Sequence, residues 1–174
     1  MVLAVIKQRR SYRDFLAKEV EEEKVEQILK SAMFAPSANH LRLWEFIVVK
    51  DKKLRDLLAA AKRWSYFVNL APIVIVVVSK KEATNRYWLE DSCIASAHIY
   101  LEAENQGLAT CFVQIYGSKR DNGADAEKYV KKILNIPDNI NVLCLMPIGY
   151  PKQKLAEHND QEFEKGKIHY EYYK

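Results

Sequence analysis

Residues 35–49 read APSANHLRLWEFIVV, and the character of the chain changes twice within this stretch. Pro36 ends any helix that precedes it, because proline lacks the backbone N–H and clashes with the turn before it. The small and polar residues up to Leu43 are typical of a loop, whereas Glu45–Val49 is β-branched and aromatic, as in a strand. The stretch therefore predicts a helix end, a loop over residues 36–43 and a strand.

Amphipathic helices are expected on both sides of this loop and strand. Upstream, acidic residues 21–23 suit a first turn, and the apolar face that follows consists of Val25, Ile28, Leu29, Ala32 and Met33. Downstream, Asp51 is a candidate N-cap for a second helix, whose apolar face consists of Leu54, Leu57, Leu58 and Ala61.

Two longer apolar segments predict the core. Residues 73–78 are almost continuously β-branched, which predicts a strand buried on both faces near the centre of a sheet. Residues 87–106 place apolar side chains in nearly every direction around a helix, with Gly107 as the natural C-cap. A helix that is apolar all round is expected to be buried.

The later part of the chain continues this mixture of elements. Residues 108–115 predict a strand, 126–133 a helix and 142–148 a last strand, in which Pro147 indicates a sheet edge or a strand end. No repeat or long linker divides the chain, so we expect one domain over residues 1–174. We expect the aromatic tail, residues 160–174, to pack as an arm on a partner subunit, since aromatic residues are enriched at interfaces.

Composition argues against several classes of protein. The net charge of +4 comes from Lys and Arg scattered among acidic residues, which indicates a solvated surface rather than a nucleic-acid footprint. The longest apolar run, residues 71–78, is too short to cross a bilayer and no signal-peptide pattern is present, so we expect a cytoplasmic protein without a membrane partner. Cys93, Cys111 and Cys144 predict buried free thiols, and without a ligand motif we expect no metal.

Two short motifs could bind a ligand. Arg9, Arg10, Ser11 and Arg13 offer bidentate donors to a phosphate plus one short hydroxyl. Taken alone, an Arg pair is more often a solvated basic helix end. The loop Ala35–His40 has small residues that let a planar ligand approach the backbone, and Ser, Asn and His to hydrogen-bond it. Taken alone, it also fits an ordinary loop.

In combination, these motifs resemble the nitroreductase family of FMN enzymes, essentially from end to end. The matching segments are, in chain order, Arg9–Phe15, Ala35–Ala38 followed by Trp44, Glu90–Asp91, Gly107–Cys111 and Pro147–Pro151. The resemblance implies an α+β, nitroreductase-like fold, with a central mixed β-sheet flanked by helices in an intertwined homodimer. It also implies that the helix over residues 87–106 is buried in that dimer and that FMN binds between the subunits.

The resemblance assigns cofactor-binding residues by position. Those expected at the FMN phosphate and the polar edge of the flavin are Arg9, Ser11 and Arg13, with Arg10 beside them and Lys152 and Lys154 as late basic candidates. Those expected along the isoalloxazine are Pro36, Ser37, Ala38 and His40 in the partner's site, and Gln114. The family commonly has Asn, Gln and Pro at the positions of His40, Arg42 and Leu43. The resemblance therefore does not decide which residues form the acceptor pocket.

The activity implied is that of an oxidoreductase whose chemistry is carried by FMN, with no catalytic side chain. It would pass reducing equivalents from NADH or NADPH to a small acceptor, such as a nitroaromatic or a quinone, with ping-pong kinetics. Two alternatives remain: a flavin-binding protein without turnover, such as a sensor or storage module, or a specialised flavin reaction such as dehalogenation on the same scaffold.

Overall fold

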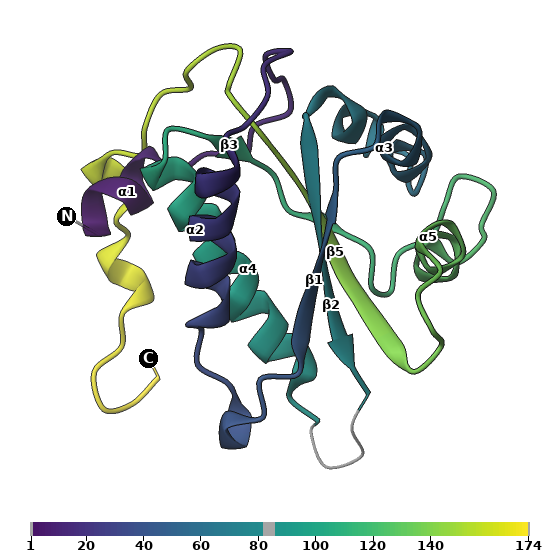
Figure 1. Cartoon of the computed structure of the whole chain (residues 1–174). Coiled ribbons are helices and arrows are strands. Elements are labelled where there is room, and N and C mark those ends of the chain that lie inside the picture. The colour runs from purple at the N-terminus through teal and green to yellow at the C-terminus, as the bar shows by residue number, and fades with distance from the viewer. Residues whose placement is uncertain (1, 82–85, 174) are drawn as a thin grey trace.

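The computed structural model describes residues 2–81 and 86–173 of the chain (Figure 1). Its helices are α1 Val2–Gln8, α2 Glu22–Met33, α3 Lys52–Ala59, α4 Trp88–Asn105 and α5 Ala126–Leu134. Its strands are β1 Trp44–Val49, β2 Ile73–Lys80, β3 Ala109–Thr110, β4 Val113–Gln114 and β5 Ile140–Gly149. Short 3₁₀ turns lie at η1 Ala38–His40, η2 Tyr66–Leu70, η3 Asp160–Glu162 and η4 Lys165–Lys167.

The strands form one sheet in the order β1-β2-β5-β3, with β4 also paired to β5. Helices α2 and α4 cover one face and α3 and α5 cover the other (Figure 1). Successive residues of β2 point into the two cores, Ile75 toward α2 and α4 and Val76 toward α3 and α5, because side chains alternate along a strand. The predicted central, doubly buried strand and the α+β architecture are confirmed.

Local signals in the sequence set the helix boundaries as expected. Helix α2 ends at Met33, just before Pro36, and the Asp51 carboxylate accepts a hydrogen bond from the Leu54 amide (2.9 Å) at the start of α3. Gly107 follows α4 with φ +70°, and the Leu108 amide donates to the Ala103 carbonyl (2.8 Å). This Schellman-type ending needs a left-handed residue, which glycine provides without strain.

The predicted strand over residues 108–115 is broken into β3 and β4, and the expectation of a sheet edge at Pro147 is wrong. Strand β5 is internal, with β2 on one side and β3 and β4 on the other, and it ends at Gly149. The pairs Thr110–Ile148 and Val113–Leu145 put the break between β3 and β4 beside Pro147. Since proline has no N–H to donate, the ladder is interrupted there.

The named strands all pair antiparallel, and an isolated parallel bridge joins Ser11 to Thr110 beside β3. This bridge ties the segment that follows α1 to the sheet. The named strands themselves form an antiparallel sheet, so the mixed sheet that the resemblance implied is not found among them.

Helix α4 is buried on one side only within a single chain. Ala95, Ile99 and Ala103 are fully buried, whereas Ile94 is 39% exposed and Cys93 is exposed beside it. The prediction of a buried thiol is therefore confirmed for Cys111 and Cys144 and wrong for Cys93, because Cys93 lies on the side of the helix that the chain leaves uncovered. Within the described ranges, no helix has both the length and the apolar character of a membrane span.

Candidate functional site

The segment after α1 runs extended along β3 and sends alternate side chains to opposite sides. The Tyr12 amide donates to the Thr110 carbonyl (3.0 Å), and the Tyr12 ring is buried. Arg10 donates to the Ala156 carbonyl, on the same side as Tyr12, whose hydroxyl accepts from the Leu155 amide. Extended backbone with a period of two therefore separates Arg10 from its neighbours Arg9 and Ser11.

Arg9 and Ser11 turn toward Tyr100 of α4. The Ser11 hydroxyl lies 2.9 Å from the Tyr100 hydroxyl, and the Arg9 guanidinium lies 5.0 Å from the centre of the Tyr100 ring. Arg13 lies over the Phe67 ring at 5.8 Å and beside Cys111, where it opposes the rise that burial causes in the pKa of that thiol. Arg9 and Ser11 thus share Tyr100, and Ser11 and Arg13 both lie beside Cys111.

The late lysines reach the same region by different contacts. Lys152 pairs with Asp14 (3.4 Å), and its amide donates to the Asp14 carbonyl (3.3 Å). Burial raises the pKa of Glu104, while Lys154 and Arg9 both act against that rise. Lys154 and Arg9 therefore flank one carboxylate near the end of α4.

The loop after α2 is held at the other end of α4. The Ala38 amide donates to the buried Asp91 carboxylate (2.9 Å), and the Ser37 hydroxyl accepts from the Arg42 amide (3.0 Å). The Arg42 guanidinium in turn donates to the Met33 carbonyl (2.6 Å). These bonds leave Pro36 and His40 exposed on the surface of the loop.

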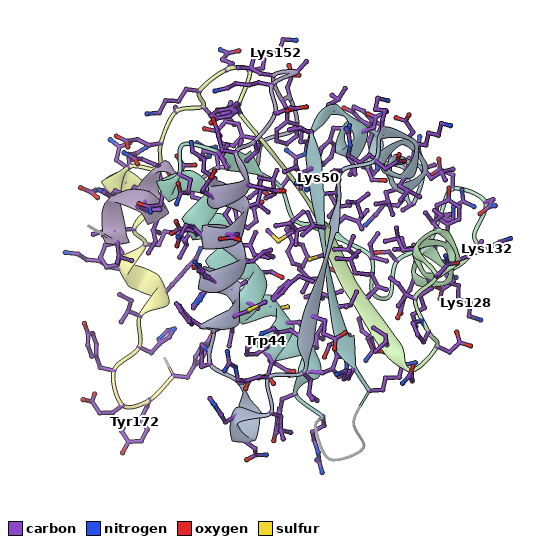
Figure 2. The ribbon with its side chains drawn as sticks, in the orientation of Figure 1. Trp44, Lys50, Lys128, Lys132, Lys152 and Tyr172 are labelled. Carbon is purple, nitrogen blue, oxygen red and sulfur yellow. The ribbon has the colours of Figure 1, made fainter. Side chains whose placement is uncertain are left out.

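The two groups do not meet within one chain. Asp91 lies in the first turn of α4, and Tyr100 follows roughly 13 Å further along the axis at 1.5 Å per residue. Figure 2 shows the same separation, with Lys152 at one end of the molecule and Trp44, which follows the loop, toward the other. A single ligand that touched both groups of one chain would have to span this separation.

Gln114 lies on β4, and its contacts are with residues outside these two groups. Its side chain donates to the Tyr116 carbonyl (3.0 Å), and the Tyr116 ring packs edge-on against Trp88 at the start of α4 (4.8 Å). The Gln114 carbonyl accepts from Lys62 (3.3 Å) and Ser118 (3.1 Å).

Sequence reasoning missed the part played by Tyr100 and Asp91. Both lie on α4 and reach the two groups through side chains that are half-buried or buried. The available signal was weak: a Tyr within an apolar helix needs a partner for its hydroxyl, and an acidic residue in a first turn is ordinary.

Fold and site together define an α+β protein whose ligand-binding groups are divided between a basic segment and a small-residue loop. The chain belongs to the Nitroreductase family, whose description it matches over residues 6–70 and 59–150, and it is an oxidoreductase of that family. The predicted family and fold are confirmed.

Known proteins agree with this assignment. The chain is 31% identical to a putative NADH dehydrogenase/NAD(P)H nitroreductase of Archaeoglobus fulgidus, over 97% of each chain. It superposes on an FMN-dependent nitroreductase from Clostridium difficile R20291 with a TM-score of 0.94 and 36% identity, covering 98% of this chain and 99% of the other. It is also 26% identical to an iodotyrosine deiodinase of Thermotoga neapolitana, over 87% of this chain and 89% of that protein.

Proposed function

We propose that this protein binds FMN between two copies of the chain and transfers reducing equivalents from NADH or NADPH to a small organic acceptor, such as a nitroaromatic or a quinone. The observation that carries the proposal is the gathering of Arg9, Ser11 and Arg13 beside α4, in a chain whose relatives are named nitroreductases.

The chemistry of this basic group fits a phosphate monoester. Two guanidinium groups and a hydroxyl offer charge-assisted and neutral hydrogen bonds to a dianion. Within the described ranges, neither Arg9 nor Arg13 enters an ion pair, whereas Lys152 is paired with Asp14. Arg9 and Arg13 therefore hold the phosphate and the polar edge of the flavin, with Lys154 in support and with Arg10 and Lys152 outside the first contacts.

The small-residue loop fits the ring of the cofactor in a partner's site. Pro36, Ser37 and Ala38 allow close approach to their backbone, and His40 is exposed nearby to hydrogen-bond. The uncovered side of α4, with Ile94 exposed, and the apolar residues of α1, among them Val2 and Leu3, supply a surface for a second copy. A homodimer related by a twofold axis would bring the loop of each copy to the basic group of the other.

FMN, when bound, supplies hydride acceptance from the nicotinamide and onward reduction of the acceptor, in two half-reactions that give ping-pong kinetics. The protein side chains orient the cofactor and polarise its ring. Arg13 places positive charge at the polar edge where negative charge develops, which stabilises the reduced cofactor. Gln114 and its neighbours on β4 orient the other edge of the ring.

Reductive dehalogenation is the second candidate function, because the relative from Thermotoga neapolitana is named an iodotyrosine deiodinase. The loop residues His40, Arg42 and Leu43 differ from the common pattern of the family, so the acceptor pocket of this chain has its own shape. The Arg42 guanidinium already donates to the Met33 carbonyl (2.6 Å), so it gives no preference for an acidic acceptor over a neutral one.

One experiment separates these activities. The purified protein is loaded with FMN and titrated anaerobically with NADH or NADPH while the visible flavin absorbance is followed. We expect the absorbance to bleach and to return when a nitroaromatic or a quinone is added. Recovery with an iodotyrosine alone would indicate dehalogenation, and bleaching by neither donor would indicate a flavin-binding protein without turnover. A protein that does not quench FMN fluorescence would overturn the proposal.

A further inference from the structure

The side chain of Tyr100 contacts three residues at the candidate phosphate site, and these residues belong to two segments of the chain. Its hydroxyl lies 2.9 Å from the Ser11 hydroxyl and accepts a hydrogen bond from the Phe112 amide at 3.0 Å. Its ring carries the Arg9 guanidinium at 5.0 Å. One phenol of α4 thus contacts the segment after α1 and the break between β3 and β4.

Counting donors and acceptors favours one direction for the hydrogen bond between Tyr100 and Ser11. The Phe112 amide has one hydrogen and can only donate, so the Tyr100 oxygen is already an acceptor. A phenol is a better donor and a poorer acceptor than an alcohol, so the favoured arrangement has the Tyr100 O–H donating to the Ser11 oxygen. The Cys111 thiol, which also lies beside both hydroxyls, is a weaker acceptor than oxygen.

This arrangement has a consequence for Ser11. Once the Ser11 oxygen accepts from Tyr100, its own hydrogen remains to be donated, on a segment that also carries Arg9 and Arg13. Burial raises the pKa of the Tyr100 phenol, which keeps it protonated and therefore a donor at neutral pH. The Phe112 amide, two residues after Thr110, faces away from β5 and donates to Tyr100 instead.

We infer that Tyr100 is a positioning residue for the cofactor phosphate: it directs the Ser11 hydroxyl hydrogen toward the anion and seats Arg9 on its ring. It acts through these two residues and does not itself contact the phosphate. The inference rests on the proposed binding of FMN at this site.

The test compares FMN with riboflavin, which has the same ring and no phosphate. Apoprotein of the wild type and of Tyr100→Phe is titrated with each ligand by fluorescence quenching. Loss of one neutral hydrogen bond predicts that Tyr100→Phe weakens FMN about three- to tenfold, while riboflavin affinity stays unchanged. Tyr129→Phe is the matched control, since its hydroxyl bonds the Leu57 carbonyl (3.1 Å) on the other face of the sheet.

A double-mutant cycle identifies the route. If Tyr100 acts through Ser11, then Tyr100→Phe with Ser11→Ala should bind FMN no more weakly than Ser11→Ala alone. If Tyr100→Phe lost affinity equally for FMN and riboflavin, the role of Tyr100 would be merely structural and the inference would be overturned. Additive losses of FMN affinity in the double-mutant cycle would also overturn it. If the Phe variant does not fold, Tyr100→Met replaces it; because this variant loses the ring as well as the hydroxyl, it is combined with Ser11→Ala and Arg9→Ala together and compared with that pair alone. A wild type that binds neither ligand would instead refute the proposed function.

Discussion

Both ends of α4 carry polar groups that could bind a ligand, but the two groups are built in different ways. Near its end, Arg9 and Ser11 project from an extended segment that is fixed by the bridge to β3 and by the buried Tyr12. Near its start, the loop over residues 36–43 has exposed side chains and irregular backbone. The basic group of Arg9, Ser11 and Arg13 is thus shaped by contacts within one chain, whereas the loop leaves its side chains exposed.

Backbone conformation sharpens this contrast. Asn39, His40 and Arg42 have φ of 51°, 56° and 49°, in the left-handed region that residues with a Cβ rarely adopt. Such residues cost of order 1 kcal/mol each and persist only where surrounding contacts hold them. Here the contacts are the bonds from Ala38 to Asp91 and from Arg42 to Ser37.

The largest expected effect comes from separating the two ends onto different chains. Arg9→Ala with Arg13→Ala removes the basic group, and Ala38→Trp blocks the loop, so each variant alone should fail to bind FMN. A heterodimer of the two, purified through different tags, then has one intact site and one doubly broken site if sites are shared. We expect about one FMN per heterodimer. No FMN in the heterodimer would mean that each site is made by a single chain.

Single substitutions at the basic end should have the next largest effect. Arg9→Ala or Arg13→Ala removes a charge-assisted hydrogen bond, worth about 1.5–3 kcal/mol, or roughly ten- to a hundredfold in FMN affinity. Arg10→Ala is the matched control on the same segment, because Arg10 turns to the Ala156 carbonyl. Equilibrium fluorescence titration measures the FMN affinity of each variant. Equal losses of affinity at all three positions would mean that only the net charge of the segment matters.

The sequence predicted the elements well where one local rule decides them. Pro36 ends α2, Asp51 caps α3 and Gly107 ends α4, because each depends on the chemistry of a single residue. It misjudged Pro147, since whether a strand is internal depends on which distant strands pair with it. It also misjudged Cys93, because an apolar helix can be buried by a partner instead of by its own chain.

The candidate site shows the same division. The motif Arg9 to Arg13 could be found from residue types, and alternation along an extended segment separates Arg10 from the others only once the backbone is known. Tyr100 and Asp91 could not be found, because their partners are far away in sequence.

Removal of the C-terminal arm should have a smaller effect that depends on protein concentration. Residues after Lys152 run beside α1, where the His158 amide donates to the Lys7 carbonyl (2.8 Å), and then leave the core. Tyr170 and Tyr173 are 73% and 90% exposed, and Figure 2 shows Tyr172 well away from the sheet. That residues 160–174 pack on a partner stays a prediction, as does a single domain over residues 1–174.

Deleting Phe163–Lys174 should therefore loosen the dimer and release FMN together, although none of the proposed flavin contacts is removed. Burial of one aromatic side chain contributes about 1.5–3 kcal/mol, so the loss of even one such contact should raise the dimer dissociation constant about ten- to a hundredfold. Sedimentation with simultaneous detection of flavin absorbance measures both quantities. A truncated protein that stays dimeric and retains FMN would show that the arm has no part in assembly.

The smallest expected effect lies at the loop end, where Asp91 holds the loop that we propose contacts FMN in the other copy. Asp91→Ala removes the acceptor of the Ala38 amide, from a side chain only 6% exposed. Loss of this bond should let residues 38–42 relax from their left-handed conformations and raise the hydrogen-exchange rate of the Ala38 amide. We expect FMN affinity to fall about three- to tenfold. Asp91→Asn keeps an acceptor oxygen, so its FMN affinity should fall less than that of Asp91→Ala.

The comparison between these two variants separates geometry from charge. If the loop needs only an acceptor at Ala38, the Asn variant stays close to the wild type, and the neighbouring Glu90→Ala, on an exposed side chain, does so as well. If the carboxylate acts by its charge, Asn and Ala should be equally weak. Because the loop would serve the partner's site, a heterodimer carrying Asp91→Ala in one chain should contain one normal and one weakened FMN site. Two equally weakened sites would mean that Asp91 acts through the stability of the whole dimer.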